Sequence, residues 1–226
     1  TKCKQSPTQQ LTSITDLVTD VEPQPLLSQA LRLSEALTFL GSSLSKADEQ
    51  KLKALEHQTA GPEIVKSIQS ILDPYCLAMI NINPESRVKV NRGPAVARLI
   101  QGGWVSYLVK VNNEAGVTAE LQVESPNAEP PLYAPSYEPQ VAEKRKLSPG
   151  QVANRFMEMQ IYRKAPLLPN LSGLKLEYAV VQLFSKDAGQ REVGLGFNIG
   201  QGTQDIGFRN AINILFESKP SIKVKF

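Results

Sequence analysis

Apolar residues in the first third of the chain recur at spacings of three and four, the period of a helix with one buried face. Such a stripe covers residues 26–40 and is followed by Gly41, a residue type favoured just beyond a helix end. Ser45, with acidic residues three and four positions later, indicates a second helix start. A third helix is predicted between the Gly-Pro pair at 61–62 and the Asp-Pro pair at 73–74.

From residue 76 onward the period shortens towards two, and the segments become short and rich in Val, Ile, Leu and aromatic residues, which predicts strands. Turn signals separate them, for example at residues 112–116 and 186–189. Helices and strands do not alternate, so a parallel α/β fold is not indicated. The predicted strands cover residues 76–82, 86–91, 97–101, 104–112, 117–124, 154–162, 174–185, 192–199, 211–217 and 221–226.

These patterns predict a mainly β fold, an antiparallel β-sandwich of the Ig-like or jelly-roll-like kind with a small N-terminal helical cap. The polar residues 1–24 are interpreted as a flexible tail, residues 25–75 as the cap and residues 76–226 as the sandwich. Six of the 16 prolines fall within residues 126–150. Because proline lacks the backbone donor of a sheet ladder, this segment is expected to be an insertion outside the regular sheets.

Composition removes several classes of function. The 226 residues are 41% hydrophobic, and 25 Lys and Arg against 22 Asp and Glu give a net charge of +3. That charge is far from the concentrated positive field that a phosphate backbone requires, so no nucleic-acid partner is predicted. The basic cluster at residues 144–146 is interpreted as part of a solvated linker. No apolar run reaches about 18 residues, so no membrane span is predicted.

Metal sites are also disfavoured. A single histidine, His57, cannot supply a site that needs two or three imidazoles, and Cys3 and Cys76 cannot form a four-thiolate zinc site. We therefore predict no metal and no cofactor. The two cysteines either form a disulfide in an oxidising compartment or remain as one exposed and one buried thiol, and the sequence leaves both alternatives open.

Catalytic candidates are few. Glu177, Asp187, Glu192 and Asp205 are candidates for a glycosidase-like carboxylate pair, but the sequence gives no distance between them, and acids on a solvated surface are the favoured interpretation. His57 lies in a polar helical stretch, and no Gly-x-Ser-x-Gly nucleophile motif occurs. No catalytic residue is predicted, and the chain is interpreted as a non-enzyme.

A glycine-rich stretch near the C-terminus superficially resembles a phosphate-binding loop. It lacks the lysine of a P-loop and is flanked by strand-like sequence, so we predict a structural connection between strands. The residues of this predicted structural loop are Gly200, Gly202, Asp205, Gly207 and Phe208.

Exposed aromatic side chains are the remaining candidates for ligand binding, because their rings can stack on sugars. Tyr133 and Tyr137, within the proline-rich segment, are the weak ligand-binding candidates. Trp104 and Tyr107 are expected to be core or half-core residues of a strand, and Tyr162 is a further candidate for stacking.

Residues 108–118, 123–127, 171–178 and 200–210 are similar to the N-terminal region of large exported bacterial proteins. In those proteins a metallohydrolase domain of the carbaryl-hydrolase-like (CehA/McbA) type, in the polymerase-and-histidinol-phosphatase (PHP) superfamily, lies downstream. The resemblance covers about residues 70–226 and includes none of the catalytic domain. It implies an exported, periplasmic or extracellular, non-catalytic region.

The predicted function is therefore a non-catalytic binding or scaffolding module, accessory to an adjoining hydrolase domain or a protein partner. Two alternatives stay open, namely a carbohydrate-binding β-sandwich with a glycan as partner and a small hydrolase that uses acidic residues.

Overall fold

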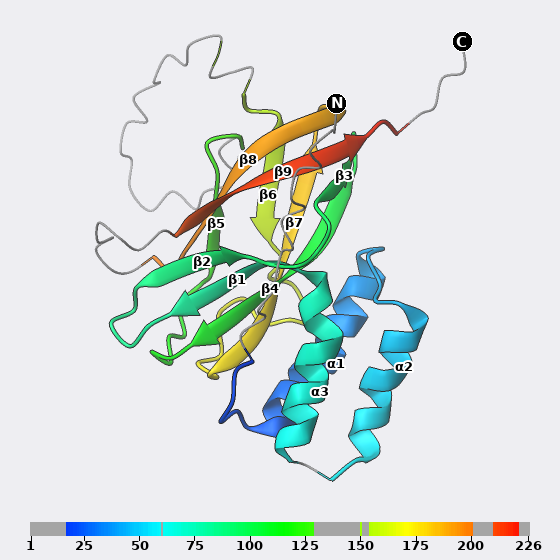
Figure 1. Ribbon diagram of the computed structural model, residues 1–226, viewed down its shortest axis with the longest axis vertical. Coiled ribbons are helices and arrows are strands. Elements are labelled where there is room, and N and C mark those ends of the chain that lie inside the picture. The colour runs from blue at the N-terminus through cyan, green and yellow to red at the C-terminus, as the bar shows by residue number, and fades with distance from the viewer. Residues whose placement is uncertain (1–16, 60, 129–149, 151–153, 201–209, 222–226) are drawn as a thin grey trace, which may run out of the picture.

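The computed structural model describes residues 17–59, 61–128, 150, 154–200 and 210–221. Within them the chain is mainly β, with two sheets and three α-helices (Figure 1). The helices are α1 Pro23–Phe39, α2 Lys46–Ala54 and α3 Pro62–Leu72, with 3-10 turns η1 Leu55–His57 and η2 Asp73–Tyr75. The strands are β1 Cys76–Ile82, β2 Val88–Arg92, β3 Arg98–Ile100, β4 Trp104–Asn113, β5 Gln122–Glu124, β6 Met157–Ile161, β7 Leu176–Ser185, β8 Gly189–Asn198 and β9 Ala211–Lys219.

The three helices form where the apolar period predicts them. The buried side chains of α1 include Leu26, Leu33 and Leu37 of the predicted stripe. Gly41 follows with φ of +71°, the left-handed conformation that a residue with a side chain rarely adopts at a helix end. The side chain of Ser45 caps α2 by accepting a hydrogen bond of 3.1 Å from the Asp48 amide. All three predicted helices are confirmed.

The sheets are mixed, and the predicted purely antiparallel arrangement is wrong. A five-stranded sheet has the order β2-β1-β4-β7-β6, and a four-stranded sheet has the order β3-β9-β8-β5. β1 runs parallel to β4 and β3 runs parallel to β9, whereas the remaining named pairs are antiparallel. Between β1 and β4 in the chain, β2 runs antiparallel to β1, and the chain crosses to the other sheet as β3 before it returns beside β1 as β4.

The first core lies between the two sheets. Alternate residues of β4 and β7, including Val109 and Val181, face Phe197 of β8 and Phe216 of β9, and all four are buried. Strands with one such apolar face bury it against the opposing sheet, which accounts for the two-layer arrangement.

A second core joins the helices to the outer face of the five-stranded sheet. Leu33 and Ile68 of the helices share an apolar cluster with Leu108 of β4 and with Tyr178 and Val180 of β7. Figure 1 shows the three helices together beside this sheet, away from β8 and β9. The helical region is therefore a third layer with its own core.

Several predicted boundaries need correction. Val18 is buried, and α1 begins at Pro23, so the packed structure starts before the expected boundary at residue 25. The strand expected at 117–124 is reduced to β5, and Ser221 lies beyond the end of β9. The turn expected at 186–189 is present between β7 and β8.

Some predictions lie largely outside the described residues. Of the proline-rich segment, only residues 126–128 and 150 are described, and residues 222–226 are not. No helix in the described parts of the chain has the length and apolarity needed to cross a membrane.

Candidate functional site

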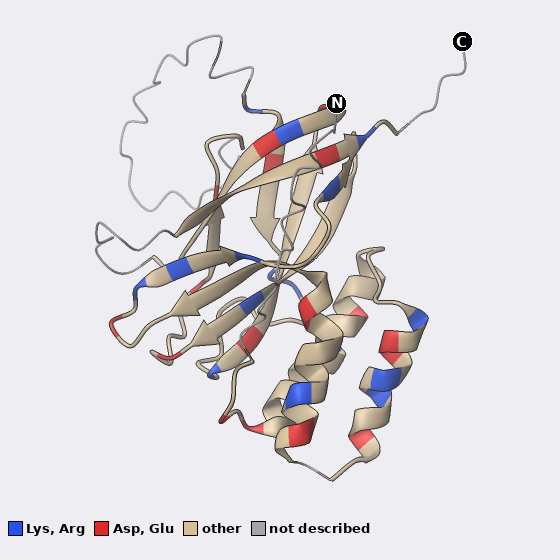
Figure 2. Ribbon diagram, in the orientation of Figure 1, with Lys and Arg blue, Asp and Glu red and all other residues tan. Residues whose placement is uncertain are grey.

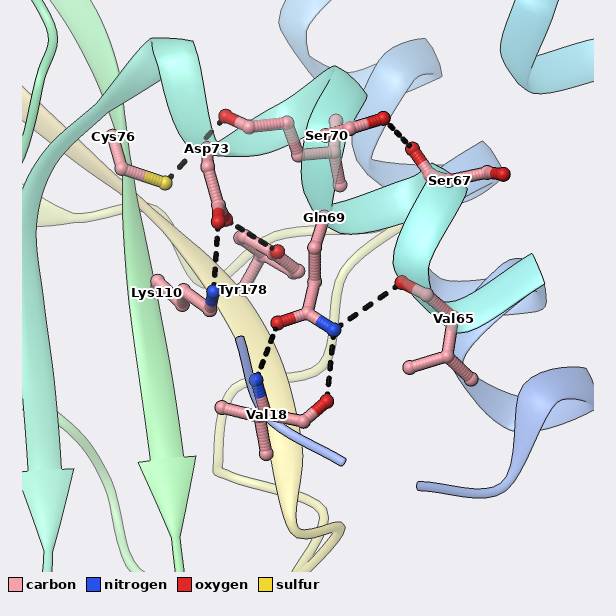
Figure 3. A network of polar contacts seen from close by, with 10 residues as sticks. Val18, Val65, Ser67, Gln69, Ser70, Asp73, Cys76, Lys110 and Tyr178 are labelled. Atoms are coloured by element: carbon pink, nitrogen blue, oxygen red, sulfur yellow. Dashed lines mark hydrogen bonds and ion pairs between the residues drawn. The ribbon is translucent and has the colours of Figure 1, made fainter. Parts of the chain in front are cut away.

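An ion pair is buried between the helices and the five-stranded sheet (Figure 3). Lys110 Nζ on β4 lies 2.8 Å from Asp73 Oδ2 in η2, and the two side chains are only 4% and 8% exposed. The Tyr178 hydroxyl on β7 donates a 2.8 Å hydrogen bond to the other carboxylate oxygen, Oδ1. Charges buried this deeply persist only when they are paired and hydrogen-bonded, so this group holds η2 against the sheet.

The neighbouring titratable groups stay neutral. Burial, followed by the negative charge of Asp73, raises the pKa of the Tyr178 phenol and of the Cys76 thiol well above their ordinary values. The Cys76 thiol lies 3.6 Å from the Leu72 carbonyl oxygen, to which it donates. A protonated, buried thiol is a poor nucleophile. Cys3, the other member of the candidate disulfide, lies outside the described residues.

A second polar contact holds Val18, in the segment before α1, against α3. The Gln69 carboxamide on α3 accepts from the Val18 amide at 2.9 Å and donates to the Val18 carbonyl oxygen, also at 2.9 Å. Figure 3 shows this contact beside the ion pair. It pairs the backbone of Val18 much as a neighbouring strand would, which stabilises a segment that has no secondary structure of its own.

Glu177, a predicted catalytic candidate, holds a loop. Its Oε2 accepts from the Ser172 amide and hydroxyl, both at 2.7 Å, and its Oε1 accepts from the Gly173 amide at 3.1 Å. Burial raises the pKa of this carboxyl, although the hydrogen bonds from Ser172 oppose the shift. The carboxylate is therefore engaged in positioning residues 172–173.

The other candidates do not gather around it. Asp187 lies 3.2 Å from Arg191 in an ion pair, Glu192 is exposed on β8, and Asp205 lies outside the described residues. His57 is exposed in η1. Among the described residues there is no group of three or more His, Cys, Asp or Glu side chains placed to hold a metal ion.

Trp104 differs from the expectation that it is a core or half-core residue. It is 44% exposed and lies on the outer face of β4, where its ring centroid is 5.5 Å from that of Phe184 on β7. In the register of the sheet, Phe184 is opposite both Trp104 and Glu158 of β6. An aromatic pair therefore remains accessible on the same sheet face that the helices cover elsewhere.

Polar side chains form the next row on that face. Gln160 of β6 and Ser106 of β4 both pair with Gln182 of β7. Gln160 Nε2 donates to Gln182 Oε1 at 2.9 Å, and Gln182 Nε2 donates to Ser106 Oγ at 3.3 Å. We call these five residues, Trp104, Phe184, Gln160, Gln182 and Ser106, the aromatic–amide face.

The tyrosine candidates are not part of this face. Tyr107 is buried, as expected for a core position, and its hydroxyl accepts from the Arg98 amide at 2.8 Å. Tyr162 is also buried, and its hydroxyl donates to the Ala165 carbonyl oxygen at 3.2 Å. Tyr133 and Tyr137 lie outside the described residues.

A groove of about 460 Å³ lies along the outer side of β9. Two large apolar side chains in its lining, Val96 and Leu215, are 65% and 62% exposed. Charged and amide groups surround them, and Figure 2 shows basic and acidic residues mixed along β8 and β9. The polar lining residues are Arg92, Arg98, Gln190, Asn213 and Glu217.

The predicted structural loop is described only at its start. Gly200 has φ of +69°, and its amide donates to Asn198 Oδ1 at 3.1 Å. This conformation favours glycine, as the prediction of a turn requires. Gly202, Asp205, Gly207 and Phe208 lie outside the described residues.

Sequence reasoning did not single out Gln160, Gln182, Val96 or Leu215. One signal was present, because Gln182 interrupts an otherwise apolar stretch at residues 179–184. A second was the alternation of β9, in which Leu215 occupies a position that faces away from the core.

Comparison with known proteins finds no matching family model and no matching curated protein. Among solved structures, the cysteine protease inhibitor EhICP2 from Entamoeba histolytica is 9% identical, with a TM-score of 0.28, over 62% of this chain and 95% of that chain. PbICP-C, solved in complex with falcipain-2, is 12% identical, with a TM-score of 0.27, over 65% of this chain and 92% of that chain. With sequence identities and TM-scores this low, the two structures support no conclusion about the function of this chain. The resemblance to exported metallohydrolase proteins stays a prediction.

Proposed function

We propose that this chain is a non-catalytic binding module of an exported bacterial protein, accessory to a hydrolase domain of the same protein. The groove along β9 is the surface on which that domain docks. The observation that carries the proposal is the exposure of Val96 and Leu215 together on the outer side of the four-stranded sheet. Exposed apolar side chains that lie together within a polar rim are typical of protein interfaces.

The polar lining of the groove suits a protein partner. The Arg92 guanidinium donates to the carbonyl oxygens of Leu77, Gly93 and Ala95, so it stiffens the groove wall. Arg98 lies 3.8 Å from Glu217 in an ion pair between largely exposed side chains. Such an exposed pair contributes little to stability and can exchange partners when a second surface docks.

The non-catalytic part of the proposal rests on how the reactive side chains are used. Asp73 and Lys110 neutralise each other, Glu177 holds a loop, and Cys76 is a protonated buried thiol. A general acid or nucleophile must reach a substrate, and these groups are enclosed in contacts that stabilise the fold.

Co-expression of this chain with the hydrolase domain from the same reading frame, as separate polypeptides, tests the docking surface. We expect the two to co-purify, and the double variant Val96→Asp/Leu215→Asp to weaken the complex at least about tenfold. Leu168→Asp is the matched control, because Leu168 is 61% exposed and does not line the groove.

Equal weakening by the control, or a reading frame without a hydrolase domain, contradicts the proposal. The chain alone is also assayed with generic esterase, phosphatase and glycosidase substrates. We expect no turnover, and turnover that purifies with the chain contradicts its non-catalytic role.

A further inference from the structure

The aromatic–amide face lies on the five-stranded sheet, whereas the groove lies along β9 of the four-stranded sheet. The five side chains of the aromatic–amide face come from three neighbouring strands in register. Trp104 and Phe184 form one cross-strand row, and Ser106, Gln182 and Gln160 form the adjacent row. Adjacent rows on one face of a sheet bring an aromatic surface directly beside a line of hydrogen-bonding groups.

The row formed by Ser106, Gln182 and Gln160 is held by hydrogen bonds within it, and Gln160 can form further hydrogen bonds. Gln182 is buried and bonded on both sides, at 2.9 Å to Gln160 and at 3.3 Å to Ser106. These bonds fix the orientation of the exposed Gln160 carboxamide, whose Oε1 then points away from Gln182. A carboxamide has two donors and one acceptor oxygen, so the outer groups of Gln160 remain available to a ligand.

The chemistry of this face selects its ligand. The ring of an exposed tryptophan presents a flat apolar surface, while carboxamides and a hydroxyl both donate and accept hydrogen bonds. A sugar ring has the complementary pattern, with C–H groups on its face and hydroxyls at its edge. The one charged side chain in register with these rows, Glu158, is acidic, which disfavours an anionic ligand.

We propose that Trp104 and Phe184, with Gln160, Gln182 and Ser106, form a binding site for a sugar ring of a neutral polysaccharide. Trp104 stacks on the face of the ring, and Gln160 hydrogen-bonds its hydroxyls. Gln182 is a positioning residue, because its two hydrogen bonds hold Gln160 in place.

Tryptophan fluorescence tests this site directly, because Trp104 is the only tryptophan of the chain. The purified chain is screened against arrayed neutral and acidic polysaccharides, and each ligand found is titrated in solution up to about 1 mM in sugar units. We expect a neutral polysaccharide to shift the emission to shorter wavelength as the indole leaves water.

Single-residue variants distinguish stacking of a sugar ring on Trp104 from nonspecific binding of the polysaccharide elsewhere on the chain. Trp104→Ala is expected to weaken binding at least about tenfold, and Gln160→Ala about three- to tenfold, as measured by calorimetry. Leu168→Ala is the matched control, because this large apolar side chain is 61% exposed, lies outside the aromatic–amide face and should leave binding unchanged. Urea unfolding of each variant shows whether it is folded.

Three results overturn the proposal. They are the absence of any neutral polysaccharide that binds in this range, binding of acidic polysaccharides alone, and a folded Trp104→Ala variant that binds as tightly as the wild-type chain.

Discussion

One face of the five-stranded sheet has two halves with opposite environments. In the covered half, Leu108 and Lys110 of β4 lie beneath the helices and are buried. In the uncovered half of the same strand Trp104 is 44% exposed, and Ser106 is half-buried at the border, where its amide donates to Ser42 Oγ at 3.4 Å. A charged residue is thus enclosed and a large aromatic residue is accessible, the reverse of what hydrophobicity alone predicts.

This inversion shows that the helices decide the environment of each position on this face. Lys110 is tolerated because Asp73 arrives with η2 as its partner. Trp104 stays accessible because the helical layer does not extend over it. Buried charged residues and exposed large apolar residues are often found at functional positions, where selection for binding offsets the loss of stability that they cause.

Removing the charge in the covered half should have the largest effect. Lys110→Ala leaves the Asp73 carboxylate buried and unpaired, so we expect the free energy of unfolding to fall by about 3 to 5 kcal/mol, measured by urea denaturation. The double variant Asp73→Asn/Lys110→Met removes both charges and should recover part of the loss. A single variant that loses less than about 1 kcal/mol would show that the pair is not isolated from water.

Truncating one apolar side chain in each half tests the comparison itself. Leu108→Ala should lower the free energy of unfolding by about 2 to 5 kcal/mol, because it leaves a cavity beneath the helices. Trp104→Ala should lower it by only about 1 to 2 kcal/mol, because Trp104 is already 44% exposed although its ring contacts Phe184. Similar losses in the two urea titrations would mean that the two halves are equally packed.

Glu177, on the opposite face of β7, should give a smaller loss than the two buried positions Lys110 and Leu108. Glu177→Gln places an amide group where the Ser172 and Gly173 amides donate, so we expect a loss of about 1 to 3 kcal/mol. The raised pKa means that Glu177 contributes most below its unfolded pKa and that this contribution falls as pH rises through the folded value. The difference between the wild-type chain and the variant should therefore be larger at about pH 4 than at about pH 7.

That pH comparison is made by urea denaturation at the two pH values. A difference that grows towards neutral pH would mean that the hydrogen bonds from residues 172–173 outweigh burial, and that the carboxyl is stabilised in its ionised form.

Local periodicity predicted the elements well. The predicted strand at residues 76–82 coincides with β1, and the apolar stripe at residues 26–40 lies almost entirely within α1, Pro23–Phe39. The parallel pairing of β1 with β4 was beyond prediction, because turn signals describe only how neighbouring segments connect. Pairing between strands separated by two others depends on the whole sheet.

The candidate site was less predictable for a similar reason. A glutamine or lysine within a strand normally indicates a solvated position, so neither Gln182 nor Lys110 stood out. Asp73 precedes Lys110 by 37 residues, and no local pattern connects the two. Trp104 drew attention as an aromatic residue, but its exposure depends on where the helical layer ends.

The second core also has a consequence during synthesis of the chain. α1 and α3 are made first, yet Tyr178 and Val180, which cover part of their apolar face, belong to β7 and are made much later. Until β7 leaves the ribosome, that face is exposed to other nascent chains and can associate with them. The long separation in the sequence between the helices and β7 therefore leaves part of the second core uncovered for as long as the intervening strands take to be made.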